Sequence, residues 1–150
     1  MQRDYTIDAP AVAMTAGTAY YILGVATSST IVCDIIDITV GCDATAAGVL
    51  KIELISWTVD GTGTAYTPKP INGDAQLMSA LITAKIAYTV APSGTITVFK
   101  TWGYPLPLAG PEIMLPLGRE ITIPKSSYYG MRLTPTTVSP NGYCNWTVEE

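Results

Sequence analysis

Apolar and polar positions alternate with a period of two along most of this chain. Short runs of β-branched and aromatic residues are separated by turn-forming Gly, Pro, Asn and Asp. This pattern is typical of β-strands, whose successive side chains point to opposite faces. It predicts an all-β sandwich or barrel of about eight strands. The predicted strands cover residues 19–25, 30–40, 48–59, 84–90, 95–104, 119–123, 128–134 and 143–149.

Two long segments change the phase of this alternation midway. In residues 30–40 the apolar positions move from odd to even numbers after Ile35, and in residues 48–59 they move from even to odd numbers after Leu54. Such a change indicates a β-bulge, or a strand that passes from one packing environment to another. Because only GCDATAAG joins the two segments, we predict that they pair along their length as a hairpin.

Four other stretches lack clear alternation. Residues 60–70 are rich in Gly, Thr and Pro and predict a loop, and PLPLAGPE at 105–112 opposes regular structure. Residues 72–87 fit a short helix capped by Asp74, or an irregular crossover that leads into the strand at 84–90. Residues 1–18 are predicted to be an extended N-terminal arm that orders against a partner, or an edge strand with a frayed end. The single sandwich domain then spans residues 19–150.

The segment LGREITIPKSSYYGMRLTPTT at 117–137 has the clearest pattern in the chain. Ile121 and Ile123 alternate with polar residues, and Tyr129, Met131 and Leu133 alternate with Tyr128, Gly130 and Arg132. We therefore predict a hairpin closed by PKSS, with Arg132 paired across the strands to Glu120. Tyr128 is on the outward face and is the residue of this segment best placed to contact a ligand.

Composition and charge narrow the choice of partner. Only 13% of the 150 residues are charged, the formal net charge is −4, and no basic run occurs. Nucleic acid and anionic membranes are therefore not expected partners. The low charge favours a surface that is partly covered by another protein. The charged start and the absence of a 20-residue apolar run predict synthesis in a cytoplasm, without a signal peptide.

Candidate chemistry is sparse. Without histidine the chain lacks the commonest general base and metal ligand. Asp34, Asp37 and Asp43 fit solvent-facing acids, with calcium binding as the alternative. We expect no catalytic, cofactor or metal site, and therefore no enzyme. The cysteines are expected to be free buried thiols rather than a disulfide; they are Cys33, Cys42 and Cys144.

Aromatic side chains are the remaining candidates for binding. In the pairs Tyr20–Tyr21 and Tyr128–Tyr129, adjacent residues point to opposite faces, so one of each pair is expected in the core. The other is free to contact a ligand. The sequence NWT at 145–147 matches a glycosylation acceptor, which we interpret as a chance match.

The C-terminal segment GREITIPKSSYYGMRLTPTTVSPNGYCNWTVEE resembles the end of small proteins encoded in the structural gene clusters of tailed bacteriophages. The segment IVCDIIDITVGCDATAAGVLKIELI is similar to a strand–turn–strand unit of the same group. The likeness runs from about Thr30 to Glu150, and residues 72–91 depart from it in being more apolar.

This resemblance implies a single jelly roll that serves as a head decoration, or cement, protein. Such a protein is expected on the outer surface of the capsid, commonly as a homotrimer, where it bridges neighbouring copies of the major capsid protein. The resemblance carries over no catalytic residue. Two alternatives stay open: a carbohydrate- or receptor-binding module of a head fibre or tail, using exposed tyrosines or Trp57 and Trp102, and a minor structural component of the virion.

Overall fold

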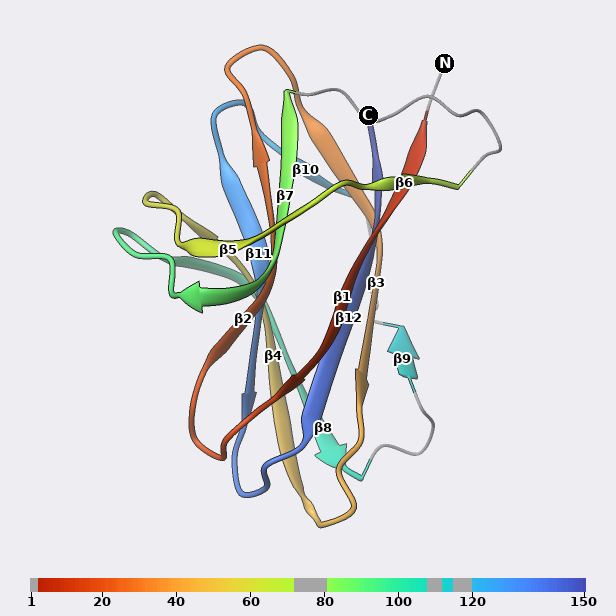
Figure 1. The fold of residues 1–150 in the computed structure, drawn as a ribbon, viewed down its shortest axis with the longest axis vertical. Coiled ribbons are helices and arrows are strands. Elements are labelled where there is room, and N and C mark those ends of the chain that lie inside the picture. The colour runs from red at the N-terminus through yellow and green to blue at the C-terminus, as the bar shows by residue number, and fades with distance from the viewer. Residues whose placement is uncertain (1–2, 72–80, 108–111, 115–119) are drawn as a thin grey trace.

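The computed structural model describes residues 3–71, 81–107, 112–114 and 120–150, and the regular structure of these residues is entirely β-strand. Two six-stranded antiparallel sheets pack face to face (Figure 1). Sheet A consists of β1 (Asp4–Ala13), β3 (Cys33–Cys42), β6 (Lys69–Pro70), β9 (Glu112–Met114), β10 (Ile121–Ile123) and β12 (Asn141–Glu149). Sheet B consists of β2 (Tyr20–Thr27), β4 (Gly48–Trp57), β5 (Thr62–Tyr66), β7 (Ile82–Val90), β8 (Thr97–Leu106) and β11 (Tyr128–Pro135). The predicted all-β sandwich is confirmed.

The strand pairing is that of a jelly roll. The outgoing strands β1, β2, β3 and β4 pair antiparallel with the returning strands β12, β11, β10 and β8, in that order. The chain thus forms a long antiparallel ribbon that is wrapped into two sheets. The strands β5, β6 and β7 are inserted between β4 and β8, and β9 lies beside β10 along the outer edge of β3.

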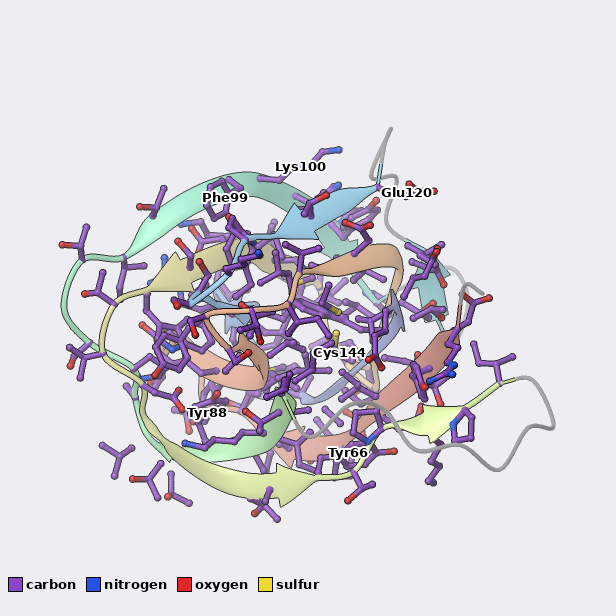
Figure 2. The ribbon with its side chains drawn as sticks, turned by 90° about the horizontal axis from the view of Figure 1, so that it is seen from above. Tyr66, Tyr88, Phe99, Lys100, Glu120 and Cys144 are labelled. Carbon is purple, nitrogen blue, oxygen red and sulfur yellow. The ribbon has the colours of Figure 1, made fainter. Side chains whose placement is uncertain are left out.

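The core lies between the sheets and is continuous. Trp146, Ile7, Ile38, Ile52 and Leu133 are fully buried in it, as alternate residues of their strands. Cys144 is near the centre of the molecule when the sandwich is seen from above, whereas Phe99 and Lys100 are at its periphery (Figure 2). The period-two pattern of the sequence therefore corresponds to burial against the opposite sheet.

Residues 4–13 correct the prediction of an N-terminal arm. They form β1, which pairs with β12 from Asp4–Glu149 to Ala13–Asn141. Tyr5 and Ile7 are buried in the core, and β6 pairs with the start of β1. Residues 4–13 are therefore a strand of the sandwich and not an arm that precedes it.

The two phase changes have different causes. In β3, Ile35 pairs with Val148 and Asp37 with Thr147, so Ile36 is an extra, bulged residue. In β4 the register with β11 is unbroken, and the apolar side chains beyond Leu54 are buried on the outer face of sheet B. Both of the mechanisms considered from the sequence are therefore used, one in each strand.

Neither predicted hairpin forms. The strands β3 and β4 belong to opposite sheets, and so do β10 and β11. Each short connection crosses from one sheet to the other, because in a wrapped ribbon the partner of a strand comes from the other half of the chain. Alternation alone cannot distinguish such a crossing from a hairpin turn.

The segments with weak alternation also contain strands. Residues 60–70, predicted to be a loop, include β5 and β6, and β7 begins at Ile82. The strand β8 extends to Leu106 through Pro105, which an edge strand tolerates. The short helix considered for 72–87 falls largely on residues 72–80, outside the described residues.

Candidate functional site

The outer face of sheet B carries a second buried layer, which we call the aromatic cap (Tyr21, Trp57 and Tyr88). Trp57 is only 3% exposed, although it is outside the main core. Its indole lies over Gly24 and Gly130, where a side chain on either glycine would collide with it. The rings of Tyr21 and Tyr88 contact it edge-on, with centroids at 6.2 and 5.8 Å. Absence of side chains at two cross-strand positions therefore makes room for the cap.

An ion pair lies beside this cap. Glu53 of β4 is 3% exposed and faces Arg132 of β11 across the strands. Arg132 Nε donates to Glu53 Oε2 at 2.7 Å, and Lys51 Nζ is 2.8 Å from Oε1. Burial acts to raise the pKa of Glu53, but the hydrogen bonds from Arg132 and Lys51 outweigh it and lower this pKa. The predicted partner of Arg132 was Glu120, and the structure replaces it with Glu53 because β10 and β11 are in different sheets.

Asp60, in the connection between β4 and β5, holds the cap in place. Its carboxylate accepts hydrogen bonds from Trp57 Nε1 at 3.1 Å, from Lys85 Nζ at 2.6 Å and from the hydroxyl of Tyr88 at 3.3 Å. It also accepts from the backbone N–H of Gly61. Burial, followed by the charge of Asp60, raises the pKa of Tyr88 well above its usual range. These groups are therefore structural partners of one another.

A pocket of about 260 Å³ lies at the end of the β4–β11 ladder, and we call it the Tyr128 pocket. It is formed by residues 56–58 and 126–129. It is lined by three serines, one threonine and three aromatic residues, and no charged side chain lines it. Tyr129 stacks on Phe99 of β8, with ring centroids 4.9 Å apart. This pocket brings together both members of the Tyr128–Tyr129 pair that the sequence analysis selected.

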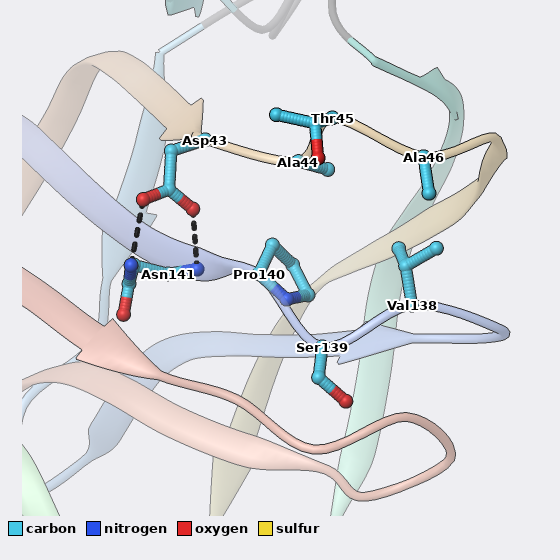
Figure 3. A pocket seen from close by; sticks show the side chains of 8 residues that line it. All are labelled: Asp43, Ala44, Thr45, Ala46, Val138, Ser139, Pro140 and Asn141. Carbon is cyan, nitrogen blue, oxygen red and sulfur yellow. Dashed lines mark hydrogen bonds between the residues drawn. The ribbon is translucent and has the colours of Figure 1, made fainter.

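A second hollow, of about 300 Å³, lies at the opposite end of the sandwich between the β3–β4 and β11–β12 loops. Both carboxylate oxygens of Asp43 face Asn141 and accept hydrogen bonds at 2.6 Å from its backbone N–H and its side-chain amide (Figure 3). The side-chain bond is the main reason that the pKa of Asp43 is lowered. Because its carboxylate is already bonded, Asp43 joins two loops and is poorly placed to bind a ligand.

The outer face of sheet A, which we call the acidic face, is polar. Asp34, Glu149 and Asp4 occupy one row across three neighbouring strands. The bulge at Ile36 puts Asp37 on the same face, whereas Asp43 is at the other end of β3. The three aspartates named in the sequence analysis therefore do not converge.

Asn145 also lies on the acidic face. Its side-chain amide donates to Asp8, which in turn accepts from the hydroxyl of Tyr66 at 3.2 Å. The asparagine of the NWT sequence is thus part of a polar network that joins sheet A to Tyr66 at the end of β5 in sheet B.

The three cysteines are free and buried, as predicted. Burial raises the pKa of Cys33 to about 12 and also raises the pKa of Cys144. A thiol with so high a pKa contains almost no thiolate at neutral pH, so these side chains are packing residues.

The tryptophans named as possible ligand contacts are not presented at the surface. Trp57 is buried as the central member of the aromatic cap, and Trp102 is 9% exposed. Of the two tyrosine pairs, Tyr20 packs on the core while Tyr21 joins the cap, and Tyr129 is buried while Tyr128 is half-buried at the pocket. Of the three sequence-selected aromatic residues that line the Tyr128 pocket, Trp57 and Tyr129 are buried and Tyr128 is half-buried.

Sequence reasoning missed Glu53, Asp60 and Lys85. The burial of Glu53 could have been predicted from its position, because alternate residues of a strand share a face. Glu53 shares a face with Ile55 and Trp57, which the phase change had indicated to be buried. Asp60 and Lys85 come from segments without clear alternation, and only the folded chain brings them within 2.6 Å.

Among the described residues, no group of three or more His, Cys, Asp or Glu side chains is arranged to hold a metal ion. The same part of the chain contains no helix long and apolar enough to cross a membrane. Comparison of the chain with models of protein families, with characterised proteins and with solved structures finds no match.

Proposed function

We propose that this chain is a non-enzymatic structural protein of a virion, a decoration protein that binds the outer surface of a phage head. In this role it bridges neighbouring copies of the major capsid protein, and it forms a homotrimer. The resemblance of residues 30–150 to phage structural proteins supports the proposal, as does the jelly roll that this resemblance implied.

One structural observation carries the proposal. The β4–β5 and β7–β8 loops lie side by side, joined by the Val59–Ser93 bridge, and project from the sandwich (Figure 1). We call residues 58–62 and 89–99 the loop ledge. Residues 89–99 contain no charged side chain, yet Val90 and Phe99 are 58% and 48% exposed.

A surface segment that exposes large apolar side chains and contains no charged residue is unusual in a protein without a partner. Depletion of charge around exposed apolar and aromatic side chains is typical of the centre of a protein–protein interface. We therefore assign the loop ledge as the surface that contacts the shell. The acidic face is then on the outside, since it would be repelled by packaged DNA.

Copy number tests the function. Quantitative mass spectrometry of virions from the phage that carries this gene is expected to give a copy number close to that of the shell protein. A handful of copies would instead assign the chain to the tail or another minor component, and its absence from virions would contradict the proposal. Light scattering of the purified protein tests the homotrimer separately.

A charge placed on the loop ledge tests the surface. Val90→Glu is expected to weaken binding to expanded empty heads by at least about tenfold, because a carboxylate would be buried without a partner. Val49→Glu is the matched control, since Val49 is 43% exposed at the far end of β4. Equal binding by the two variants would remove the loop ledge from the interface.

A further inference from the structure

The Tyr128 pocket borders the loop ledge, with which it shares Thr58, and has a chemistry that the decoration role does not use. Its hydroxyls come from two segments, Ser56 and Thr58 on one side and Ser126 and Ser127 on the other. Within the part of the chain that the structure describes, the side chains of Ser56, Ser126 and Tyr128 make no hydrogen bond. Three hydroxyls, each able to donate and to accept, therefore border the same small volume without a protein partner.

The pocket offers little to an ion. No charged side chain lines it. The backbone N–H groups that would otherwise attract an anion are already used, because Ser126 N donates to Ser28 O at 2.9 Å and Ser127 N to the hydroxyl of Thr27 at 3.2 Å. A phosphate or carboxylate would lose its hydration here without gaining a charged partner.

The turn that carries two of these hydroxyls is held in a fixed conformation. Ser126 has a φ of 55°, in the left-handed region that residues other than glycine seldom adopt. The hydroxyl of Thr27 anchors the turn on both sides, by donating to Pro124 O and accepting from Ser127 N. Strained backbone that the surrounding contacts hold in place is frequent at binding sites, and a pre-formed pocket lowers the ordering cost of binding.

We propose that the Tyr128 pocket binds one neutral sugar unit. Hydroxyls that donate and accept fit the hydroxyls of a sugar, and the half-buried ring of Tyr128 offers apolar surface to its C–H groups. A volume of about 260 Å³ accommodates a single pyranose ring. Because hydroxyl contacts replace contacts with water, we expect a Kd of about 1 mM. This inference does not rest on the decoration role.

Titration of the labelled protein with glucose, galactose and N-acetylglucosamine, followed by amide chemical shifts, tests the proposal. At least one sugar is expected to shift the signals of residues 56–58 and 126–129. N-acetylneuraminic acid and inorganic phosphate are expected to leave them unchanged. The same titration with a polysaccharide made of the sugar that binds then identifies the source of the ligand. Shifts with the polysaccharide indicate a sugar at the end of a cell-surface chain, and shifts with the monosaccharide alone indicate the free sugar.

Three variants localise the site. Ser56→Ala and Tyr128→Phe each remove one hydroxyl and are expected to weaken binding by about three- to tenfold, which corresponds to about 0.7–1.4 kcal/mol. Ser139→Ala, in the hollow at the opposite end, is expected to change nothing. Thermal unfolding of each variant verifies that it is folded. Absence of any shift with the neutral sugars, or equal binding by all variants, overturns the proposal.

Discussion

The outer faces of the two sheets hold their carboxylates in opposite ways. Each lies on the far side of a sheet from the core. The acidic face of sheet A places the half-buried Asp4, Glu149 and Asp34 side by side, and one carboxylate oxygen of Asp34 is buried there without a hydrogen-bond partner among the described residues. The outer face of sheet B buries its carboxylate, and the 3% exposed Glu53 lies between Arg132 and Lys51 beside the aromatic cap.

The difference shows that the energetic role of a charge depends on what covers it. On the acidic face, like charges in directly opposed cross-strand positions repel one another and weaken the sheet. On sheet B the Glu53 carboxylate is buried beside the cap, so removal of Arg132 would leave a buried charge without its main partner. The two faces should therefore respond to the same kind of substitution with opposite signs.

Of the substitutions that test this contrast, removal of the Trp57 indole is expected to change the stability of the protein most. Trp57→Ala should lower the free energy of unfolding by about 3–5 kcal/mol, as for other buried aromatic residues. It would also leave Asp60 without the hydrogen bond from Nε1. Urea unfolding measures the change, and Trp57→Phe should recover part of it. A loss below 1 kcal/mol would mean that the cap is not a packed layer.

Loss of the ion pair between Arg132 and Glu53 is expected to have the next largest effect on stability. Arg132→Met should lower stability by about 3 kcal/mol, since it leaves the Glu53 carboxylate buried with only Lys51. Adding Glu53→Met should restore much of this loss, because an apolar pair needs no charged partner. A double variant no more stable than the single one would contradict the assigned role of the pair.

The same pair predicts a pH dependence. The folded-state pKa of Glu53 is below its ordinary value of 4.5, so the stabilisation is complete above that pH and is lost as the pH falls through the folded-state pKa. The stability difference between the wild type and Glu53→Gln should therefore shrink in acid. A constant difference from pH 7 to about pH 3 would show that the carboxylate charge is not involved.

The glycines beneath the indole give a smaller and more local test. A Cβ at Gly130 would collide with Trp57 Cη2 and with the backbone oxygen of Leu23. Gly130→Ala should therefore cost about 1–3 kcal/mol in denaturant unfolding. Gly103→Ala is the matched control in sheet B, since its Cβ would be 3.9 Å from Val49. Similar stability of both variants would mean that the sheet can shift beneath the cap.

The positions of the strands could be predicted from the sequence better than the pairing between them. Alternation located the core positions of β11 and β12 and marked the phase change at Ile35, because it depends only on neighbouring residues. It also gave a change of packing environment as one of two explanations for the phase change in β4 after Leu54. The pairing of Arg132 with Glu53 depends on which half of the ribbon returns beside β4, and no local pattern encodes that.

The same limit applies to the candidate site. Tyr128 was identified from its parity alone, because an outward position on a predicted strand is a local property. The rest of its pocket comes from residues 56–58, some 70 positions earlier in the chain. Only the ladder between β4 and β11 brings the two segments together, through the Tyr128–Trp57 pair.

Neutralisation of one acid on the acidic face should give the smallest effect, and one of opposite sign. Glu149 lies between Asp34 and Asp4, so Glu149→Gln removes two like-charge contacts. Stability should rise by about 0.2–1 kcal/mol in thermal unfolding at low ionic strength, and the gain should fade as salt screens the face. Asp43→Asn is the control, since the Asp43 carboxylate accepts two hydrogen bonds and its loss should destabilise the fold. If Glu149→Gln is destabilising at every salt concentration, the row of acids is held by contacts that outweigh its repulsion, and the two faces differ less than their exposure indicates.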